Sequence, residues 1–404
     1  MRILFISPRQ CWPARSGAKL REYHFARALA ERGRLTYLHF ADPGVEPLTR
    51  KDLPFCHDVV AIPKPAAYGP AKLVQGVFGH WPLPILNYTS QEMSAAVERM
   101  TRTGPYDLIH LDSIHMVRYG EAIGRHIGNK ARLVYNWHNI ESEAMRRFSA
   151  TVASPAKRLY ARLTASKLAS LEQHILQTSF GHVVCSARER EELARIAPSA
   201  RIAVIENGVD VAGLAAGADA LTESHKIIFV GLMDYYPNVE AATSFAQRIW
   251  PVLRQQFPKL NLWIVGANPV PAVTQLGNLE GVTVTGTVPE VRPYYRDALA
   301  AIVPLRTGGG TRLKILEAMA AGVPVISTPL GAEGLTVTAG ENILMADPDD
   351  AETWLNHLEY LMESASARKA LSAAALDLVR TSYDWEILGR KLSDTYEDWL
   401  RGEV

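Results

Sequence analysis

RTGGGTRLKILEAMAAGVPVIS, residues 306–327, is the stretch that decides the fold. It follows the apolar run LAAIVPL (299–305) and ends in another, VPVIS (323–327), so it joins two short strands. Between them, TRLKILEAMAAG places leucine, isoleucine, alanine and methionine on one face of a helix that stops at Gly322. Two strands joined through a helix indicate a parallel sheet and therefore an α/β protein.

Strand and helix patterns alternate in the same way along both halves of the chain. In the second half, apolar runs that end in glycine precede the quoted stretch: KIIFVG (226–231), NLWIVG (261–266) and VTVTG (282–286). In the first half the runs are RILFIS (2–7), LTYLHF (35–40), DVVAIP (58–63), DLIHLD (107–112), RLVYNWH (132–138), HVVCS (182–186) and RIAVIENGVD (201–210). This rhythm predicts two doubly wound Rossmann-like domains that face each other.

The expected domains are residues 1–200 and residues 201–383. AGLAAGADALTESH (212–225) is small and polar, as a linker would be. The closing helix, 384–404, is expected to pack back on the first domain.

Composition and charge argue against several classes of protein. The 404 residues carry 43 basic and 42 acidic side chains, so the net charge of +1 disfavours nucleic acid as a main partner. Three cysteines, far apart and outside CxxC spacing, argue against a disulfide framework or a cysteine-bound metal. No signal-peptide core precedes Pro8, and no apolar stretch reaches the length of a membrane span. We therefore expect a cytoplasmic protein whose contact with a membrane is limited to the membrane surface.

The glycine turn at 306–310 has the features of an anion site. Its glycines let the backbone approach a ligand closely, and the helix that follows presents unpaired N–H groups with a partial positive charge. Arg306, Arg312 and Lys314 suit a diphosphate, whereas Glu317 is placed to accept hydrogen bonds from a pair of sugar hydroxyls. The alternative is a tight structural turn with surface cations. Neither a Walker motif nor GxGxxG after the first strand is present, which argues against a P-loop ATPase and a nicotinamide dehydrogenase.

RTGGGTRLKILEAMAAGVPVISTPLGAEGL (306–335) resembles the C-terminal signature of the retaining glycosyltransferases of family 4. More narrowly, it is similar to bacterial exopolysaccharide-associated sugar transferases with the motif RxGGGxRxKxLEAMAxGxPVVST. Supporting matches are WHNIE (137–141), IENGVD (205–210), FVGLMDYYPN (229–238) and YDWEILGRKLSDTYEDW (383–399). The resemblance implies the GT-B fold. It also implies transfer of a hexose, with retention, from a nucleoside-diphosphate sugar to a saccharide or lipid-linked saccharide in cell-surface or exopolysaccharide biosynthesis.

The same resemblance gives the two domains separate substrates. It implies that residues 1–200 bind the acceptor and that residues 201–383 bind the nucleotide sugar. It implies no cofactor and no metal, because the helix terminus and the cations would stabilise the leaving diphosphate. DPDD (347–350) contains a formal DxD, but it precedes a helical run and is expected to be an N-cap loop. The base and the sugar stay open.

Two positions depart from the family pattern. The family has E-x7-E, and Gly309 stands where the first glutamate would be. Sugar recognition is therefore expected to use the backbone amides of Gly309, Gly310 and Thr311. Many members also carry arginine and lysine after the first strand of the second domain, where this chain reads GLMDYYPN from Gly231 onward. Gly231 is still expected to lie against the donor.

The expected replacements for those missing cations are Arg306, Arg312 and Lys314. Arg312 and Lys314 are predicted to be catalytic, through charge stabilisation of the leaving diphosphate. Glu317 keeps its family counterpart, which implies that it binds the ribose hydroxyls.

Further site residues follow from the resemblance in the first domain and near the base. His138 matches the family histidine near the donor sugar and is predicted to be catalytic, although a lone histidine is otherwise structural or solvated. Gly17 resembles the glycine loop that approaches the donor diphosphate; the alternative is an ordinary helix entry. The backbone around Val288 is expected to contact the base. Asp112 and Glu141 are acceptor candidates, and Glu141 alternatively caps the next helix.

A basic segment spans residues 144–171 without an aspartate or glutamate. Its cations are Arg146, Arg147, Lys157, Arg158, Arg162 and Lys167. This helical face is either an ordinary solvated surface or a site for anionic lipid or a phosphate-bearing acceptor. Together with the apolar, aromatic-rich GVFGHWPLPILNY (76–88), it favours a polyprenyl-linked acceptor and peripheral contact with an anionic membrane.

Two other functions stay open at this stage. A nucleotide-sugar epimerase of the GT-B type would need no acceptor and would release an altered sugar or a free nucleotide. A non-catalytic partner subunit would bind nucleotide sugar without turnover, and the missing glutamate at Gly309 makes this alternative relevant.

Overall fold

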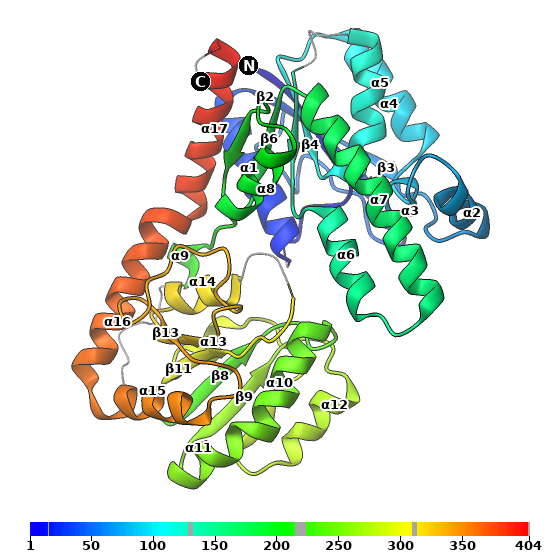
Figure 1. Ribbon diagram of the computed structural model, residues 1–404. Helices are drawn as coiled ribbons and strands as arrows, with labels where there is room; N and C mark the ends of the chain where they lie inside the picture. The colour runs from blue at the N-terminus through cyan, green and yellow to red at the C-terminus, as the bar shows by residue number, and fades with distance from the viewer. Residues whose placement is uncertain (15, 128–131, 215–223, 309–312, 403–404) are drawn as a thin grey trace. The chain divides into compact units, whose positions relative to one another are not determined.

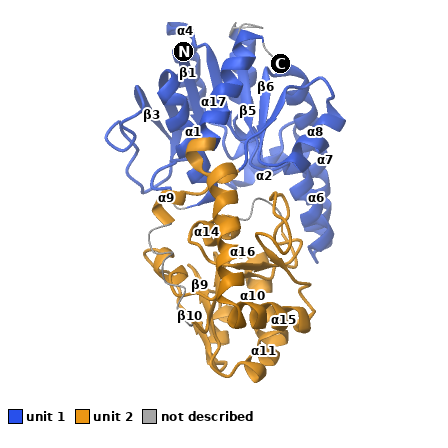
Figure 2. Ribbon diagram, turned by 90° about the vertical axis from the view of Figure 1, so that its left-hand side faces the viewer, with its two compact units in different colours: residues 1–206, 388–404 blue, residues 207–387 orange. Residues whose placement is uncertain are grey.

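The computed structural model describes residues 1–404 except 15, 128–131, 215–223, 309–312 and 403–404 (Figure 1). The chain divides into two compact units, which are Met1–Glu206 with Leu388–Val404 (unit 1) and Asn207–Ile387 (unit 2) (Figure 2). The boundary expected at residue 200 is too early, because strand β7 (Ile202–Val204) pairs with β6 and completes the sheet of unit 1.

Unit 1 is built on a seven-stranded parallel sheet of order β3-β2-β1-β4-β5-β6-β7. Besides β7 its strands are β1 (Arg2–Ser7), β2 (Arg34–Ala41), β3 (Asp58–Pro63), β4 (Leu108–Asp112), β5 (Leu133–Asn136) and β6 (Gly181–Val184). The strand order reverses between β1 and β4. The segments that follow these two strands therefore diverge, which opens room for a ligand at their carboxyl ends.

Helices cover this sheet and carry its connections. They are α1 (Gly17–Arg32), α2 (Pro70–Phe78), α3 (Leu83–Leu86), α4 (Gln91–Thr103), η1 (Ile114–Met116), α5 (Val117–Ile127), α6 (Glu141–Thr151), α7 (Pro155–Thr178) and α8 (Ala187–Ile196). Helix α1 is the first helix after β1. Its buried face includes Glu22, Phe25, Ala26 and Leu29, which recur at helical spacing. This places two charged side chains of α1, Arg21 and Glu22, under the sheet rather than in solvent.

Unit 2 repeats the architecture with six parallel strands in the order β10-β9-β8-β11-β12-β13. The strands are β8 (Lys226–Val230), β9 (Asn261–Val265), β10 (Val282–Val284), β11 (Ala300–Val303), β12 (Val325–Ser327) and β13 (Leu344–Met345). The order reverses between β8 and β11. The prediction of two Rossmann-like domains is confirmed, although the two-residue strand β13 was not predicted.

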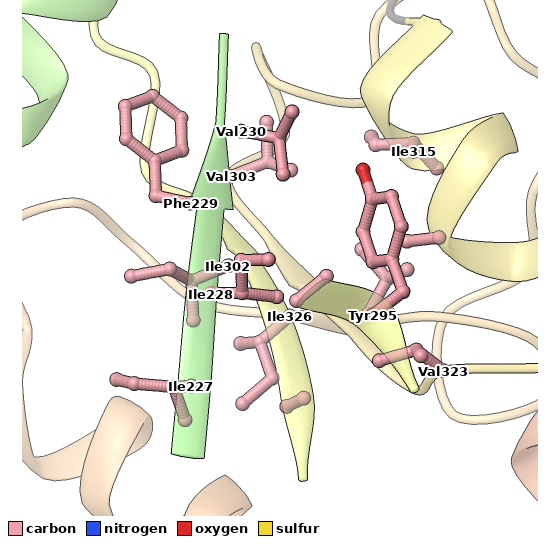
Figure 3. Packing of buried hydrophobic residues seen from close by; sticks show 14 of the residues in the cluster. Ile227, Ile228, Phe229, Val230, Tyr295, Ile302, Val303, Ile315, Val323 and Ile326 are labelled. Atoms are coloured by element: carbon pink, nitrogen blue, oxygen red, sulfur yellow. The ribbon is translucent and has the colours of Figure 1, made fainter. Parts of the chain in front are cut away.

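The helices of unit 2 enclose a single apolar core. They are α9 (Val211–Leu214), α10 (Tyr236–Arg248), α11 (Trp250–Gln256), α12 (Pro271–Thr274), η3 (Gln275–Asn278), α13 (Arg292–Tyr295), α14 (Leu313–Ala320), α15 (Ala351–Glu363), α16 (Ala365–Leu378) and the π-turn η4 (Val379–Tyr383). Figure 3 shows Ile227, Ile228 and Phe229 of β8 beside Ile302 and Val303 of β11. Ile315 of α14 packs into the same core, so the helix after the glycine turn is firmly anchored.

Helix α17 (Trp385–Arg401) starts in unit 2, and its residues from Leu388 onward belong to unit 1. There the Tyr396 hydroxyl lies 2.8 Å from His110 Nδ1, and Arg132 donates to the carbonyl of Leu400 over 2.8 Å. Among the described helices none is long and apolar enough to cross a membrane.

Candidate functional site

The carboxyl ends of β4 and β5 bring two predicted residues together in unit 1. Asp112 is the last residue of β4, and His138 follows β5 by two residues. The ring N–H at Nε2 of His138 donates to Asp112 Oδ2 over 2.8 Å. The side-chain amide of Asn136 donates to the other carboxylate oxygen, Oδ1, over 2.6 Å. Asp112, predicted as an acceptor candidate, therefore orients His138 directly.

Helix α1 and the segment after β1 complete this cluster with residues that sequence reasoning missed. Arg21 donates to Asn136 Oδ1 through Nε (3.0 Å) and Nη2 (2.8 Å). Glu22 accepts a hydrogen bond from the Ser7 hydroxyl (2.9 Å) and forms an ion pair with Arg9 (2.9 Å). A signal for Glu22 existed, because it shares the helical face of Phe25, Ala26 and Leu29.

Burial and charge set the protonation of this cluster. Burial alone would raise the pKa of Asp112, but the charge of His138 and hydrogen bonds from its neighbours hold that pKa well below its usual range. Burial, reinforced by the negative charge of Asp112, raises the pKa of Glu22 well above its usual range. Burial also lowers the pKa of His110 and, with Arg9 and His138 nearby, lowers the pKa of His115 to about 3. Asp112 is thus an anion, and burial favours the neutral form of His110 and His115.

Glu22, Asp112 and His138 also form a group that could hold a metal ion. Each offers one ligand atom, and these atoms lie within 4.8 Å of one another. The Arg9 guanidinium already lies against Glu22, so a cation there would compete with an existing positive charge.

Two further predicted residues of unit 1 lie at helix starts. Glu141 is the first residue of α6, and burial, with repulsion from Glu172, raises its pKa to about 7. Gly17 is the first residue of α1, where the Ser16 side chain caps the helix by accepting from the Lys19 amide. Gly17 thus lies at a capped helix entry, and its contact with the donor diphosphate stays a prediction.

In unit 2, the ends of β8 and α14 bring Gly231 and Lys314 together. The Lys314 ammonium donates to Asn238 Oδ1 over 2.6 Å and lies 4.6 Å from the centre of the Phe229 ring. Asn238 in turn donates to the carbonyl of Leu232 over 2.9 Å. A Cβ on Gly231 would lie 2.6 Å from Asn238 Nδ2 and 3.0 Å from Lys314 Nζ, so glycine leaves the space beside this lysine open. Asn238 was not predicted.

Arg306 has an anionic partner. Both of its terminal nitrogens donate to the Asp349 carboxylate over 2.7 Å, and Arg248 adds a third bond of 2.9 Å. Bonds from Arg306 lower the pKa of Asp349 to about 2. Binding of a diphosphate by Arg306 stays a prediction, and it would require the ligand to replace this exposed bidentate pair. Asp350, the next residue, caps α15, so the predicted N-cap loop is confirmed.

Glu317 and Val288 are two further predicted donor residues that the structure describes. Glu317 lies half-buried on α14, and burial raises its pKa to about 7 against the opposing charge of Lys314. Val288 packs, partly buried, against the core of unit 2. The other predicted donor residues, Gly309, Gly310, Thr311 and Arg312, lie outside the described residues.

Two family models match the chain along most of its length. "Glycosyltransferase Family 4" matches residues 15–212, and "Glycosyl transferases group 1" matches residues 224–364. The chain belongs to glycosyltransferase family 4. The first match falls almost wholly within unit 1 and the second within unit 2, so each unit carries its own family signature.

Relatives and solved structures resemble parts or all of the chain. A Klebsiella pneumoniae protein, "Uncharacterized 44.6 kDa protein in cps region", is 24% identical over 39% of the chain and 42% of its own length. The chain spans about half the length of the curated relatives it matches. Sucrose-phosphate synthase from Thermosynechococcus elongatus superposes with a TM-score of 0.72 at 18% identity over 100% of both chains. Anabaena HepE, solved with UDP-glucose, superposes with a TM-score of 0.67 at 17% identity, over 98% of this chain and 100% of HepE. These likenesses establish the fold.

Proposed function

We propose that this glycosyltransferase moves a hexose from a nucleoside-diphosphate sugar to a saccharide or lipid-linked saccharide, in cell-surface or exopolysaccharide biosynthesis. The observation that carries the proposal is the placement of Lys314 beside Gly231 at the strand-order reversal of unit 2. A lysine next to open backbone at the carboxyl ends of β8 and β11 suits a phosphate group. The Klebsiella relative from a cps region and the UDP-glucose complex of HepE favour this class of substrate.

Donor binding divides between cations and a carboxylate. Lys314, with Arg312 and Arg306, would neutralise the diphosphate, and Arg306 would exchange Asp349 for phosphate oxygens. Glu317 would accept hydrogen bonds from the ribose hydroxyls. No metal is required in this proposal, because fixed cations stabilise the charge of the leaving group.

The reaction breaks the bond between sugar C1 and the diphosphate oxygen, and both electrons leave with the diphosphate. The acceptor oxygen bonds to C1 from the same face, and its proton passes to that diphosphate oxygen, so the configuration is retained. His138 would hydrogen-bond a sugar hydroxyl and fix the reacting geometry, with Asp112 holding its ring.

An apolar-basic surface on unit 1 favours a lipid-linked acceptor. Leu159 and Leu163 lie one turn apart on α7 and are 60% and 44% exposed. One turn further, Lys167 donates to the carbonyls of Gly76, Val77 and Gly79 at the end of α2. These bonds join α7 to the end of α2, where Phe78 is 86% exposed.

The cations of this surface support the same partner. Lys157, Arg158 and Arg162 are exposed on α7 beside the leucines. Exposed apolar groups beside cations suit an anionic bilayer surface. The basic segment is not uniformly solvated, however, since the Lys167 ammonium donates to the α2 carbonyls.

The proposal implies a cytoplasmic enzyme in peripheral contact with the membrane. We expect the protein to bind anionic vesicles but not neutral vesicles. A variant with both Lys157→Gln and Arg162→Gln should lose this binding. Failure of the unmodified protein to bind anionic vesicles would refute the membrane contact.

Thermal shift with a panel of nucleotides and nucleotide sugars in EDTA tests the donor site. One nucleoside-diphosphate sugar should stabilise the protein in EDTA. Lys314→Ala and Glu317→Ala should each abolish the shift, whereas Lys259→Ala, an exposed lysine of unit 2, should keep it. Release of a sugar product only with acceptor present separates transfer from epimerisation. Donor binding without turnover on any acceptor would favour the non-catalytic partner instead.

A further inference from the structure

Glu22 is a buried carboxyl group for which donor binding and sugar transfer provide no role. Its side chain is fully buried on α1, and its carboxyl group lies within 4.8 Å of the facing atoms of Asp112 and His138. Two carboxyl groups this close in a buried cluster cannot both ionise without a large cost, so one of them holds a proton.

Asp112 is better placed than Glu22 to carry the negative charge. It accepts from the Asn136 amide (2.6 Å) and from His138 (2.8 Å), and His110 Nε2 lies 3.6 Å away. Three polar groups thus converge on one carboxylate. Each hydrogen bond favours the ionised form of the group that accepts it.

Glu22 has poorer support for a negative charge. The Ser7 hydroxyl donates to Glu22 Oε2. Arg9 Nε lies 2.9 Å from Glu22 Oε1 but is not aligned for a hydrogen bond. Among the described residues, Arg9 Nε and Glu22 Oε1 both lack a hydrogen-bond partner. A misaligned ion pair recovers little of the cost of burying a charge.

Other titratable groups around the pair are accounted for. The groups that face Glu22 are Arg9 and Cys11 from the segment after β1, Tyr37 from β2, Asp112 from β4 and His138 from the segment after β5. Burial keeps the Cys11 thiol and the Tyr37 hydroxyl neutral by raising their pKa values. The groups that face Asp112 are Glu22, His110, His138 and, through Asn136, Arg21. Arg9 is therefore the one arginine or lysine among the described groups that face Glu22.

We propose that Glu22 is protonated at neutral pH and is a positioning residue whose carboxyl O–H donates a hydrogen bond to the Asp112 carboxylate. This hydrogen bond, with the proton kept on Glu22, favours the anionic form of Asp112. Asp112 holds His138 by Nε2, which leaves Nδ1 as the ring nitrogen that meets a substrate hydroxyl. The inference deepens the proposed function, because it rests on His138 acting on the sugar. It adds a buried residue, remote from the substrate, to the machinery of transfer.

Infrared difference spectroscopy tests the protonation directly and needs no substrate. The unmodified protein minus Glu22→Gln should show a protonated-carboxyl band at neutral pH. Glu92→Gln, at an exposed glutamate whose pKa a Ser90 hydrogen bond lowers, is the matched control and should show none. Absence of the band in the Glu22 difference would overturn the proposal, as would its loss on addition of zinc or magnesium, which would make the cluster a metal site.

Kinetics and stability separate positioning from an ion-pair role. Glu22→Leu removes the donor and should lower turnover by about 10- to 100-fold, the value of a charged hydrogen bond. Glu22→Gln keeps a neutral N–H donor, so it should recover most of that loss. The unmodified enzyme is expected to lose turnover at alkaline pH as Glu22 ionises, and Glu22→Gln should abolish this fall. If Glu22→Gln instead unfolds as readily as Glu22→Leu, Glu22 is the ionised partner of Arg9 and the proposal fails. A protein without turnover on any substrate refutes the proposed function and leaves the infrared result valid.

Discussion

Glu317 is a carboxyl group that should be half protonated near neutral pH in the free protein, because burial raises its pKa to about 7. A carboxylate accepts hydrogen bonds from ribose hydroxyls more strongly than a carboxylic acid does, so donor binding should favour the ionised form. We expect nucleotide-sugar affinity to fall by about tenfold between about pH 8 and pH 6, measured by calorimetry.

The control is Glu317→Gln, whose weaker affinity should not vary over this pH range. A nucleotide sugar is the right probe, since its diphosphate is esterified at both ends and does not titrate near neutral pH. An equal pH dependence in the glutamine variant would assign the effect to another group.

Gly231 tests the proposed phosphate site without removing a charge. Alanine there would place Cβ 2.6 Å from Asn238 Nδ2 and 3.0 Å from Lys314 Nζ, so the pair must move. We expect Gly231→Ala to weaken nucleotide-sugar binding by about tenfold or more. Gly124→Ala in helix α5 has open space around its Cβ and should bind the donor normally. Equal binding by both variants would mean that the donor does not use this space.

Some of these site residues could be predicted from the sequence, and the reason lies in their position along strands. Asp112 and His138 stand where apolar runs end, and parallel strands end at one edge of a sheet, so their proximity follows. Glu22 and Asn238 could not be assigned in this way. Their roles come from contacts with Asp112 and Lys314, far away in sequence, and a helical pattern shows only that a residue faces inward.

At the scale of elements, Lys167 fastens α2 to α7. Its ammonium donates to three carbonyls at the end of α2, which have no helical partner of their own. Lys167→Met should therefore cost about 2 kcal/mol of stability and speed amide exchange in α2. Lys157→Met, an exposed lysine on the same helix, should change neither quantity. Unchanged exchange in α2 would show that apolar packing alone holds it.

The elements themselves were predictable where the pattern is long and uniform. Buried parallel strands are continuous apolar runs, and every predicted run in the described chain forms a strand or its flank. Strand β13 has two residues, too few for any period, and the boundary after Glu206 depends on the pairing of β7 with β6, which no local pattern encodes. The basic segment was predicted to be helical, and it lies in helices α6 and α7. Its sequence does not indicate that Lys167 donates to carbonyls of α2.

At the scale of the whole molecule, several buried carboxyl groups couple folding to pH. Burial raises the pKa values of Glu22, Glu172 and Glu189, and those of Glu141 and Glu317 to about 7. A raised pKa means that the folded state binds more protons than the unfolded chain between the ordinary glutamate value of 4.5 and the folded value. Stability is then greatest below that range and falls as pH rises through about 7.

Asp112 has the opposite sign, because its lowered pKa makes stability fall once pH drops below its ordinary value of 3.8. We therefore expect the thermal midpoint to peak near about pH 5 and to decline toward about pH 8, followed by calorimetry. The double variant Glu141→Gln, Glu317→Gln should flatten the decline, whereas Glu92→Gln, at an exposed site, should leave it intact. Saturating nucleotide sugar should also reduce the decline of the thermal midpoint with pH. The ligand binds ionised Glu317, so its binding releases the proton that Glu317 holds in the folded, unliganded protein. A midpoint that rises steadily from pH 5 to pH 8 without ligand would mean that these glutamates are ionised in the folded protein.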